Sequence, residues 1–281
     1  MSTNKIKTII NKVAEVAELY GINNCYVVGG YPRSVIMNNI SDDVHDLDFA
    51  SAWPGEATKL GSLVAGKLSK ELPEIYHRTG TVKTTYNGMD LEFQGTYGPI
   101  SDNLNIVQEM ERFGISICPL NINIYARDFT INTLIQDLYD KEIYDITGYG
   151  VKDIENKIIR TVINPDISIP SNPLIILRAI RFSLRYNFEI DKKLIQSIKT
   201  NSSLLRQQLS PERLQIELLK MLKSDYEGTI NKMKKFGLME VMQNKDYDIF
   251  EIIKDVDVKN FSKDLDNIMT EISSWNGIKK I

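Results

Sequence analysis

Two aspartates separated by one residue are the feature of this sequence that most directly suggests chemistry. Asp46 and Asp48 alternate with the apolar residues Leu47 and Phe49, which is the pattern of a β-strand with one polar face. Both carboxylates would point to the same side of that strand and repel each other. A hard divalent cation such as Mg²⁺ relieves this repulsion because it prefers oxygen ligands. Alternating acids also occur on solvated strand edges, so the pair alone leaves both interpretations open.

A third carboxylate follows on another β-rich segment. Two such segments, 78–86 and 89–97, flank Asn87-Gly88, which is a strong signal for a hairpin turn, and Glu92 lies on the second segment. A third acid from a neighbouring strand would complete the ligand set for two divalent ions about 3.5–4 Å apart. Asp90 would share the face of Glu92 and is the alternative ligand.

A pair of glycines ends a third β-rich run, residues 25–28. Gly29 and Gly30 would allow backbone N–H groups to approach phosphate oxygens closely. Arg33 follows three residues later and could make a bidentate phosphate contact. A double glycine is also an ordinary turn signal, so it indicates a phosphate site only in combination with the carboxylates.

The elements that would position these residues form an α/β pattern followed by helices. Apolar spacing predicts helices over 6–20 and 56–68, with the three β-rich segments between and after them. We expect residues 98–120 to be irregular and residues 126–140 to form a helix that enters a strand. From about residue 151 the periodicity is helical, with Arg and Lys on the polar faces. The fold class is therefore a small mixed sheet with helices, followed by an all-helical part.

Composition limits the class of protein. The 281 residues are 42% hydrophobic and 25% charged, as in globular proteins, and the net charge is −3. Residues 1–150 carry −7 and residues 151–240 carry +6, which suits an enzyme that holds a polyanion, although solvated helix faces give the same imbalance. Cys25 and Cys118 are read as buried small residues in a reducing compartment. With no signal peptide and no membrane span expected, we predict a cytoplasmic protein that does not contact membranes.

Six segments together resemble the class II tRNA nucleotidyltransferase and bacterial poly(A) polymerase family. In order they are VVGGYPRS with DLDFA, RTGTVKTTYNGMDLEF, ARDFTINTL, YDITGYGVKDIENKIIRTV, NPLIILRAIRF and LSPERLQIELLK, and they cover residues from about 25 to 225. The resemblance implies a nucleotidyltransferase-type head over residues 1–145, a helical neck over 146–225 and a short helical body over 226–281.

The resemblance also implies roles for individual residues. Asp46, Asp48 and Glu92 would be the catalytic metal ligands for two Mg²⁺ ions. The residues that would bind the incoming nucleoside triphosphate, ATP or as a second candidate CTP, are Gly29, Gly30, Arg33, Arg127, Asp128, Asn132, Asn172, Arg178 and Arg181. Arg178 and Arg181 are spaced i and i+3, so they share one helix face.

One departure from the family pattern concerns base selection. The family's neck helix usually begins Glu-Asp-x-x-Arg, whose Asp and Arg hydrogen-bond the edge of the incoming base. This chain has Ser171-Asn172-Pro173-Leu174-Ile175 at that place, and isoleucine offers no hydrogen-bond donor. Loss of such contacts weakens discrimination between bases.

The sequence thus predicts an RNA nucleotidyltransferase that joins NMP from an NTP to an RNA 3′-hydroxyl, with the 3′ end of tRNA as the expected partner. The first alternative is a poly(A)-polymerase-like or low-fidelity tailing enzyme, since the altered stretch affects base choice. The second alternative is an inactive RNA-binding module. The sequence leaves the oligomeric state open.

Overall fold

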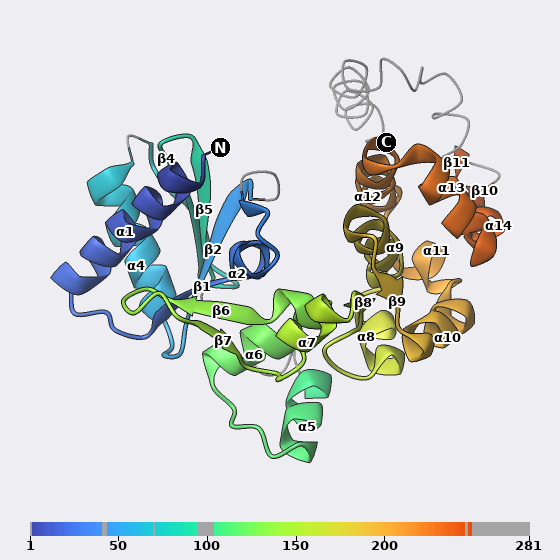
Figure 1. Cartoon of the computed structure of the whole chain (residues 1–281), viewed down its shortest axis with the longest axis horizontal. Helices are drawn as coiled ribbons and strands as arrows, with labels where there is room; N and C mark the ends of the chain where they lie inside the picture. The colour runs from blue at the N-terminus through green and yellow to red at the C-terminus, as the bar shows by residue number, and fades with distance from the viewer. Residues whose placement is uncertain (1, 41–43, 70, 95–103, 245–246, 249–281) are drawn as a thin grey trace, which may run out of the picture. The chain divides into compact units, whose positions relative to one another are not determined.

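The computed structural model of the chain describes residues 2–40, 44–69, 71–94, 104–244 and 247–248. It divides into two compact units, residues 1–167 and residues 168–281. Each unit is described by itself below (Figure 1).

A mixed sheet forms the centre of the first unit. Among the described residues its strand order is β3-β4-β5-β2-β1-β6-β7. The pair β2–β5 is parallel, and the other neighbouring strands are antiparallel. The strands are β1 (Cys25–Val28), β2 (Asp46–Ser51), β3 (Glu74–Tyr76), β4 (Thr81–Tyr86), β5 (Met89–Gln94), β6 (Leu134–Asp137) and β7 (Ile143–Asp145). The mixed sheet expected from the sequence is confirmed.

Helices α1 (Thr3–Leu19) and α4 (Glu56–Leu68) lie side by side over one face of this sheet (Figure 1). That face carries the apolar members of the alternating strands, and Phe49 and Phe93 stack there with ring centroids 4.7 Å apart. Gly61 of α4 lies against Phe93, and a Cβ atom at residue 61 would come within 2.8 Å of it. This close packing leaves the polar members of β2 and β5 on the opposite face.

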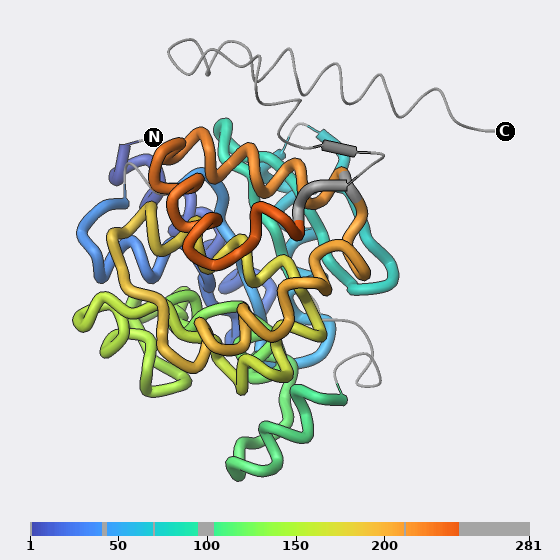
Figure 2. Tube along the Cα trace, turned by 90° about the vertical axis from the view of Figure 1, so that its right-hand side faces the viewer, coloured from blue at the N-terminus to red at the C-terminus, as the bar shows by residue number. Residues whose placement is uncertain are grey.

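Two shorter helices also pack on the sheet. Helix α2 (Gly30–Ile36) packs on β1, β2 and β6, and its Tyr31 belongs to the large apolar cluster shared with α1 and α4. Helix α6 (Pro119–Tyr125) packs on β2, where its Ile124 joins a smaller apolar cluster with Val28 and Ala50. Helix α5 (Leu104–Arg112) contacts α6 and projects from the rest of the unit (Figures 1 and 2).

The hairpin predicted at Asn87-Gly88 is confirmed. Both residues have positive φ, 52° and 73°, as a two-residue turn of the type favoured in hairpins requires. The turn pairs Tyr86 with Met89 and fixes the register of the remaining strand pairs, including Lys83 with Glu92.

Two expectations about the middle of the chain were wrong. The segment 98–120 was expected to be irregular, but residues 104–112 form α5 and residue 119 begins α6; residues 98–103 lie outside the described residues. The helix expected in 126–140 is only a 3₁₀ turn, Thr130–Asn132, before β6. There, the Asp128 carboxylate accepts the Phe129 N–H at 2.8 Å, an alternative to helical hydrogen bonding that short polar side chains often provide.

The remainder of the chain is mainly helical, as expected. After α7 (Gly150–Glu155) and the short β8 (Ile158–Ile159), helix α8 (Pro165–Ser171) contains the boundary between the units. The second unit then consists of α9 (Ile175–Tyr186), β9 (Glu189–Ile190), α10 (Lys192–Asn201), α11 (Leu204–Gln208), α12 (Pro211–Ser224), α13 (Tyr226–Lys235), α14 (Leu238–Met242), β10 (Gln243–Asn244) and β11 (Tyr247–Asp248). Helix α9 is its centre and packs against α12 and α13.

The cysteines and the membrane prediction can also be compared with the structure. Both cysteines are free; Cys25 is buried, but Cys118 is only half-buried because it caps the start of α6, so the prediction of full burial was wrong for Cys118. In the part of the chain described, no helix is both long and apolar enough to cross a membrane.

Candidate active site

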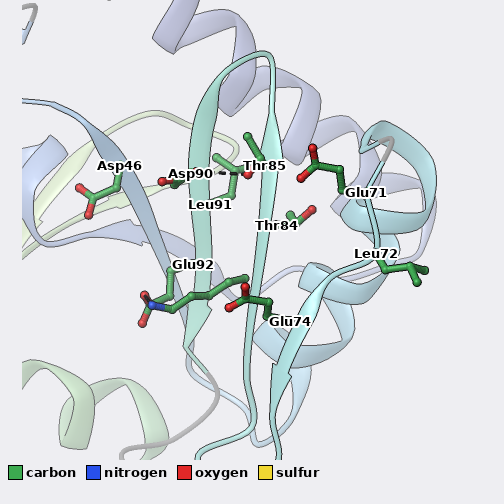
Figure 3. A pocket seen from close by; sticks show the side chains of 10 residues that line it. Asp46, Glu71, Leu72, Glu74, Thr84, Thr85, Asp90, Leu91 and Glu92 are labelled. Carbon is green, nitrogen blue, oxygen red and sulfur yellow. Dashed lines mark hydrogen bonds and ion pairs between the residues drawn. The ribbon is translucent and has the colours of Figure 1, made fainter. Parts of the chain in front are cut away.

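Strand pairing places the predicted metal ligands on one face of the sheet. In the parallel pair of β2 and β5, Asp48 lies directly opposite Glu92, and Asp46 lies opposite Asp90. Side chains at opposed positions of a pair point to the same side. Figure 3 shows Asp46, Asp90 and Glu92 projecting from these two strands. The structure therefore places the three predicted carboxylates on one face of two neighbouring strands, with the alternative ligand Asp90 on the same face.

Asp48 is the electrostatic centre of this group. Its pKa is raised to about 7, mainly by burial and also by the charges of Asp46 and Glu92, although Arg127 acts in the opposite direction. A carboxyl group whose charged form is disfavoured by burial and by like charges is stabilised by a nearby cation. Oxygen ligands with an excess of negative charge thus suit a hard divalent ion.

One oxygen of Glu92 is engaged by a lysine of the neighbouring strand. The Glu92 Oε2 atom forms an ion pair with Lys83 Nζ at 2.8 Å. The hydrogen bond to Glu92 raises the pKa of Lys83. Among the described residues, no group of three His, Cys, Asp or Glu side chains is arranged so that it could hold a metal ion. In this structure Glu92 is therefore paired with Lys83 and is not arranged with Asp46 and Asp48 as a three-ligand group.

Gly29 is in close contact with this group. Its φ is +75°, and a Cβ atom there would lie 2.7 Å from Arg127 Nη1 and 2.8 Å from Asp48 Oδ2. The predicted role of Gly29 needs such a close backbone approach, which only glycine allows without strain. Gly30 follows as the first residue of α2.

Arg127 is held in place by two amide side chains. Its Nη2 donates to Asn123 Oδ1 at 3.0 Å and to Gln94 Oε1 at 3.4 Å. Asn123 in turn donates to Gln94 at 2.7 Å, and Gln94 Nε2 lies 3.5 Å from Glu92 Oε1. This network connects the end of β5, which carries Glu92, with α6 and with the guanidinium that faces Asp48.

Three further predicted residues form a buried group. Arg33 Nη1 donates to the Asn132 side-chain oxygen, and Asn132 Nδ2 donates to Asp128 Oδ1 at 2.8 Å. Arg33 is only 5% exposed. The structure thus brings Arg33, Asp128 and Asn132 together, but they bond one another, so the direct phosphate contact expected for Arg33 stays a prediction.

A cavity of about 280 Å³ opens beside the carboxylates (Figure 3). Its lining includes the acids Asp46, Asp90 and Glu92 at one end and Glu71 and Glu74 at the other. The acids therefore border an open space that is not filled by side chains.

The predicted nucleotide-binding residues of the second unit lie on or just before α9. Arg181 Nε donates to the carboxylate of the buried Glu217 on α12, and its guanidinium lies 4.6 Å from the Phe182 ring centroid. Arg178 is half-buried one turn earlier, and Asn172 is half-buried at the C-terminal end of α8. Ile175, where the family has an arginine, is 5% exposed. This position thus belongs to the apolar core of the second unit.

Sequence reasoning missed three residues of the first-unit site: Lys83, Gln94 and Asn123. Lys83 could have been found, because a two-residue turn at Asn87-Gly88 sets it opposite Glu92. Gln94 and Asn123 meet across 29 residues of sequence, and no local pattern indicates that contact.

Two family models match the chain. Residues 25–160 match the poly A polymerase head domain, and residues 187–245 match the probable RNA and SrmB-binding site of polymerase A. Both matches follow the order expected from the sequence motifs.

Curated relatives agree with these matches. The CCA-adding enzyme of Lactobacillus helveticus is 32% identical over 206 residues, which is 70% of this chain and 45% of the relative. The tRNA nucleotidyltransferase cca2 of Schizosaccharomyces pombe is 32% identical over 190 residues, or 66% of this chain and 36% of the relative. The chain therefore spans less than half the length of these relatives.

Solved structures share the fold. The Thermotoga maritima CCA-adding enzyme complexed with tRNA has a TM-score of 0.67 and 22% identity, with 86% of this chain and 53% of that chain covered. The Bacillus stearothermophilus enzyme in complex with CTP gives 0.64 and 24%, covering 85% and 53%. From its motifs, its sheet topology and these matches, the chain belongs to the class II tRNA nucleotidyltransferase and bacterial poly(A) polymerase family.

Proposed function

We propose that this chain is an RNA nucleotidyltransferase that adds nucleotides to the 3′ end of tRNA. The observation that carries the proposal is the parallel register of β2 and β5, which gathers Asp46, Asp48 and Glu92 on one face. Gly29 closely approaches Asp48, and Asp46 and Glu92 line an open cavity. Relatives that share this head are named CCA-adding enzymes, and solved neighbours are complexes with tRNA and with CTP.

Asp46, Asp48 and Glu92 would hold two Mg²⁺ ions. When bound, these ions would supply the charge that favours an RNA 3′-hydroxylate and neutralises the triphosphate. The protein's part is to position the reactants and to stabilise charge. Gly29 lets the backbone come close to the phosphates, and Arg127, which faces Asp48, presents a guanidinium to them. The products are an RNA longer by one nucleotide and pyrophosphate.

The second unit would hold the nucleotide and the RNA. Arg178 and Arg181 on α9 and Asn172 before it remain the predicted contacts to the nucleotide. We also propose that the protein works in the cytoplasm, where tRNA precursors, ATP and CTP are its substrates.

A poly(A)-polymerase-like or low-fidelity tailing enzyme is the second candidate. The observation in its favour is Ile175, which lies in the core of the second unit where the family has a base-reading arginine. A site that lacks this donor would discriminate less between bases.

A substrate series distinguishes these functions. Purified protein with Mg²⁺ and each NTP singly is incubated with tRNA transcripts that end before CCA, after C or after CC, and with an unstructured RNA. We expect addition of a few nucleotides to tRNA only. Long A tails on every RNA would support the second candidate instead. RNA binding without addition in any lane would mean that the chain is a binding module and would overturn the proposal.

A further inference from the structure

Lys83 lies between two carboxylates on neighbouring strands. On β5, Glu92 lies directly opposite Lys83, and the Lys83 ammonium forms an ion pair with the Glu92 carboxylate at 2.8 Å. On β3, Glu74 is also directly opposite Lys83 in the antiparallel pair. All three side chains therefore stand on the face of the sheet that carries Asp48, and Figure 3 shows Glu74 and Glu92 on either side of β4.

The ammonium of Lys83 places a positive charge beside Glu92, one of the predicted metal ligands. Its Nζ lies 2.8 Å from Glu92 Oε2, and Glu92 lies directly opposite Asp48 in the β2–β5 pair. Lys83 engages one oxygen of Glu92, and among the described residues the acids do not form a group of three metal ligands. The Tyr76 ring, whose centroid lies 5.5 Å from Nζ, lines its position on the β3 side, and the Tyr76 hydroxyl donates to Glu74 at 2.9 Å.

We propose that Lys83 is a tethered counterion that competes with the divalent ions for Glu92. Without a metal ion it neutralises Glu92 and limits the repulsion among the acids. When a divalent ion binds, Lys83 leaves Glu92 and pairs with Glu74 on the other neighbouring strand. Lys83 is thus a positioning residue that sets metal affinity. This inference rests on the metal site of the proposed function.

The test measures binding of Mn²⁺, as a paramagnetic probe for Mg²⁺, to the full chain without nucleotide. Free Mn²⁺ is followed by its electron paramagnetic resonance signal. Lys83→Met removes the competing charge, so we expect Mn²⁺ to bind more tightly, on the order of three- to tenfold. Lys83→Arg keeps the charge and should bind Mn²⁺ about as the wild type does.

A matched control is available on α1. Lys12 pairs with Glu15 at 2.6 Å in a similarly exposed ion pair on another element. Lys12→Met removes the same charge and should leave Mn²⁺ affinity within about twofold, because solvent screens distant exposed charges. Circular dichroism spectra of every variant show that the fold is kept.

The outcomes separate this inference from the proposed function. If the wild type binds Mn²⁺ and Asp48→Asn abolishes binding, the metal site stands. Unchanged or weaker binding by Lys83→Met would then overturn the counterion role alone. A wild type that does not bind Mn²⁺ would overturn both.

Discussion

Asp48 is held in the folded chain at an electrostatic cost. Its carboxyl group is removed from water and faces Asp46 and Glu92, and its pKa rises from 3.8 to about 7. The folded state therefore binds a proton at pH values where the unfolded state has already lost it. By linkage, the contribution of Asp48 to stability falls as the pH rises from about 4 to about 7 and then levels off.

This cost predicts how the variant Asp48→Asn behaves. In EDTA at pH 8, we expect the variant to melt at a higher temperature than the wild type, because the unfavourable charge is gone. The difference should shrink as the pH falls below 7 and disappear near pH 4. Thermal unfolding followed by circular dichroism across this range measures it. A variant less stable than the wild type at pH 8 would contradict the electrostatic account.

Gly29 gives a second prediction at this scale. Gly29→Ala puts a methyl group within 3 Å of Arg127 and Asp48 at a φ of +75°, so we expect a loss of about 1–3 kcal/mol of stability and of most nucleotide addition. The control is Gly66→Ala on α4, where nothing lies within 4 Å of the new methyl group. Alanine in a helix should stabilise that variant by about 0.5–1 kcal/mol. Chemical denaturation with an incorporation assay measures both; equal stabilities of the two variants would refute the contact at Gly29.

Only the part of the site that follows from the alternation of polar and apolar residues and from the family motifs was predictable from the sequence. Asp46, Asp48 and Glu92 follow from strands with period two, and the structure places them on one face. The pairing of Glu92 with Lys83 was missed, although the two-residue turn at Asn87-Gly88 sets the register that puts them opposite each other.

At the scale of elements, β5 and α6 are joined by side chains that also hold Arg127. Gln94 and Asn123 each accept a hydrogen bond from its guanidinium. Two acceptors hold the guanidinium in one orientation, so less side-chain entropy is lost when a phosphate binds to it.

Gln94→Ala should therefore weaken nucleotide binding. We expect KM for the NTP to rise by roughly three- to tenfold, with a smaller change in kcat, and the melting temperature to stay within about 3 °C. Gln136→Ala serves as the control, because Gln136 on β6 donates instead to the Lys141 carbonyl at 2.8 Å. Steady-state kinetics at saturating RNA give both parameters. A change in kcat alone would mean that Gln94 acts on Glu92 rather than through Arg127.

Elements with strong local patterns were predictable, and those set by tertiary contacts were not. The hairpin, β2 and α4 follow from turn residues and from periodicity. The sequence predicted a helix that enters a strand over residues 126–140, but the helical part is only a 3₁₀ turn. There the Thr130 N–H donates to the Arg160 carbonyl, 30 residues away, and the Asp128 carboxylate accepts the Phe129 N–H. Tertiary and side-chain hydrogen bonds replaced the helical ladder there.

At the scale of the whole chain, charge is distributed unevenly. The net charge is −3, yet residues 151–240 carry +6. Helix α10 presents three exposed lysines, Lys192, Lys193 and Lys199. We expect RNA to bind mainly through this basic part, with an affinity that falls steeply as salt rises.

Replacing these three lysines by glutamine should weaken RNA binding at low salt and reduce the slope of log K against log salt. Glutamine at Lys5, Lys7 and Lys59, which are exposed lysines of the first unit, removes the same charge and should change the slope by less than one unit. Filter binding from about 50 to 200 mM salt gives the slopes. Equal effects of the two triple variants would mean that net charge, not the basic part, governs binding.

The division into head, neck and body remains a prediction at this scale. The structure itself separates residues 1–167 from residues 168–281, and the family models match 25–160 and 187–245. The sequence indicated the change from sheet to helices near residue 151, because the period of the apolar residues changes there.

Nucleotide incorporation by Asp48→Ala tests the central claim most directly. Labelled NTP, Mg²⁺ and a tRNA transcript lacking CCA are incubated with the wild type and with the variant, and a circular dichroism melt verifies that the variant is folded. We predict that the folded variant loses at least about 10³-fold in rate, since its carboxylate would hold the ions that stabilise the reacting charges. A folded Asp48→Ala protein that extends the transcript at the wild-type rate would contradict the account.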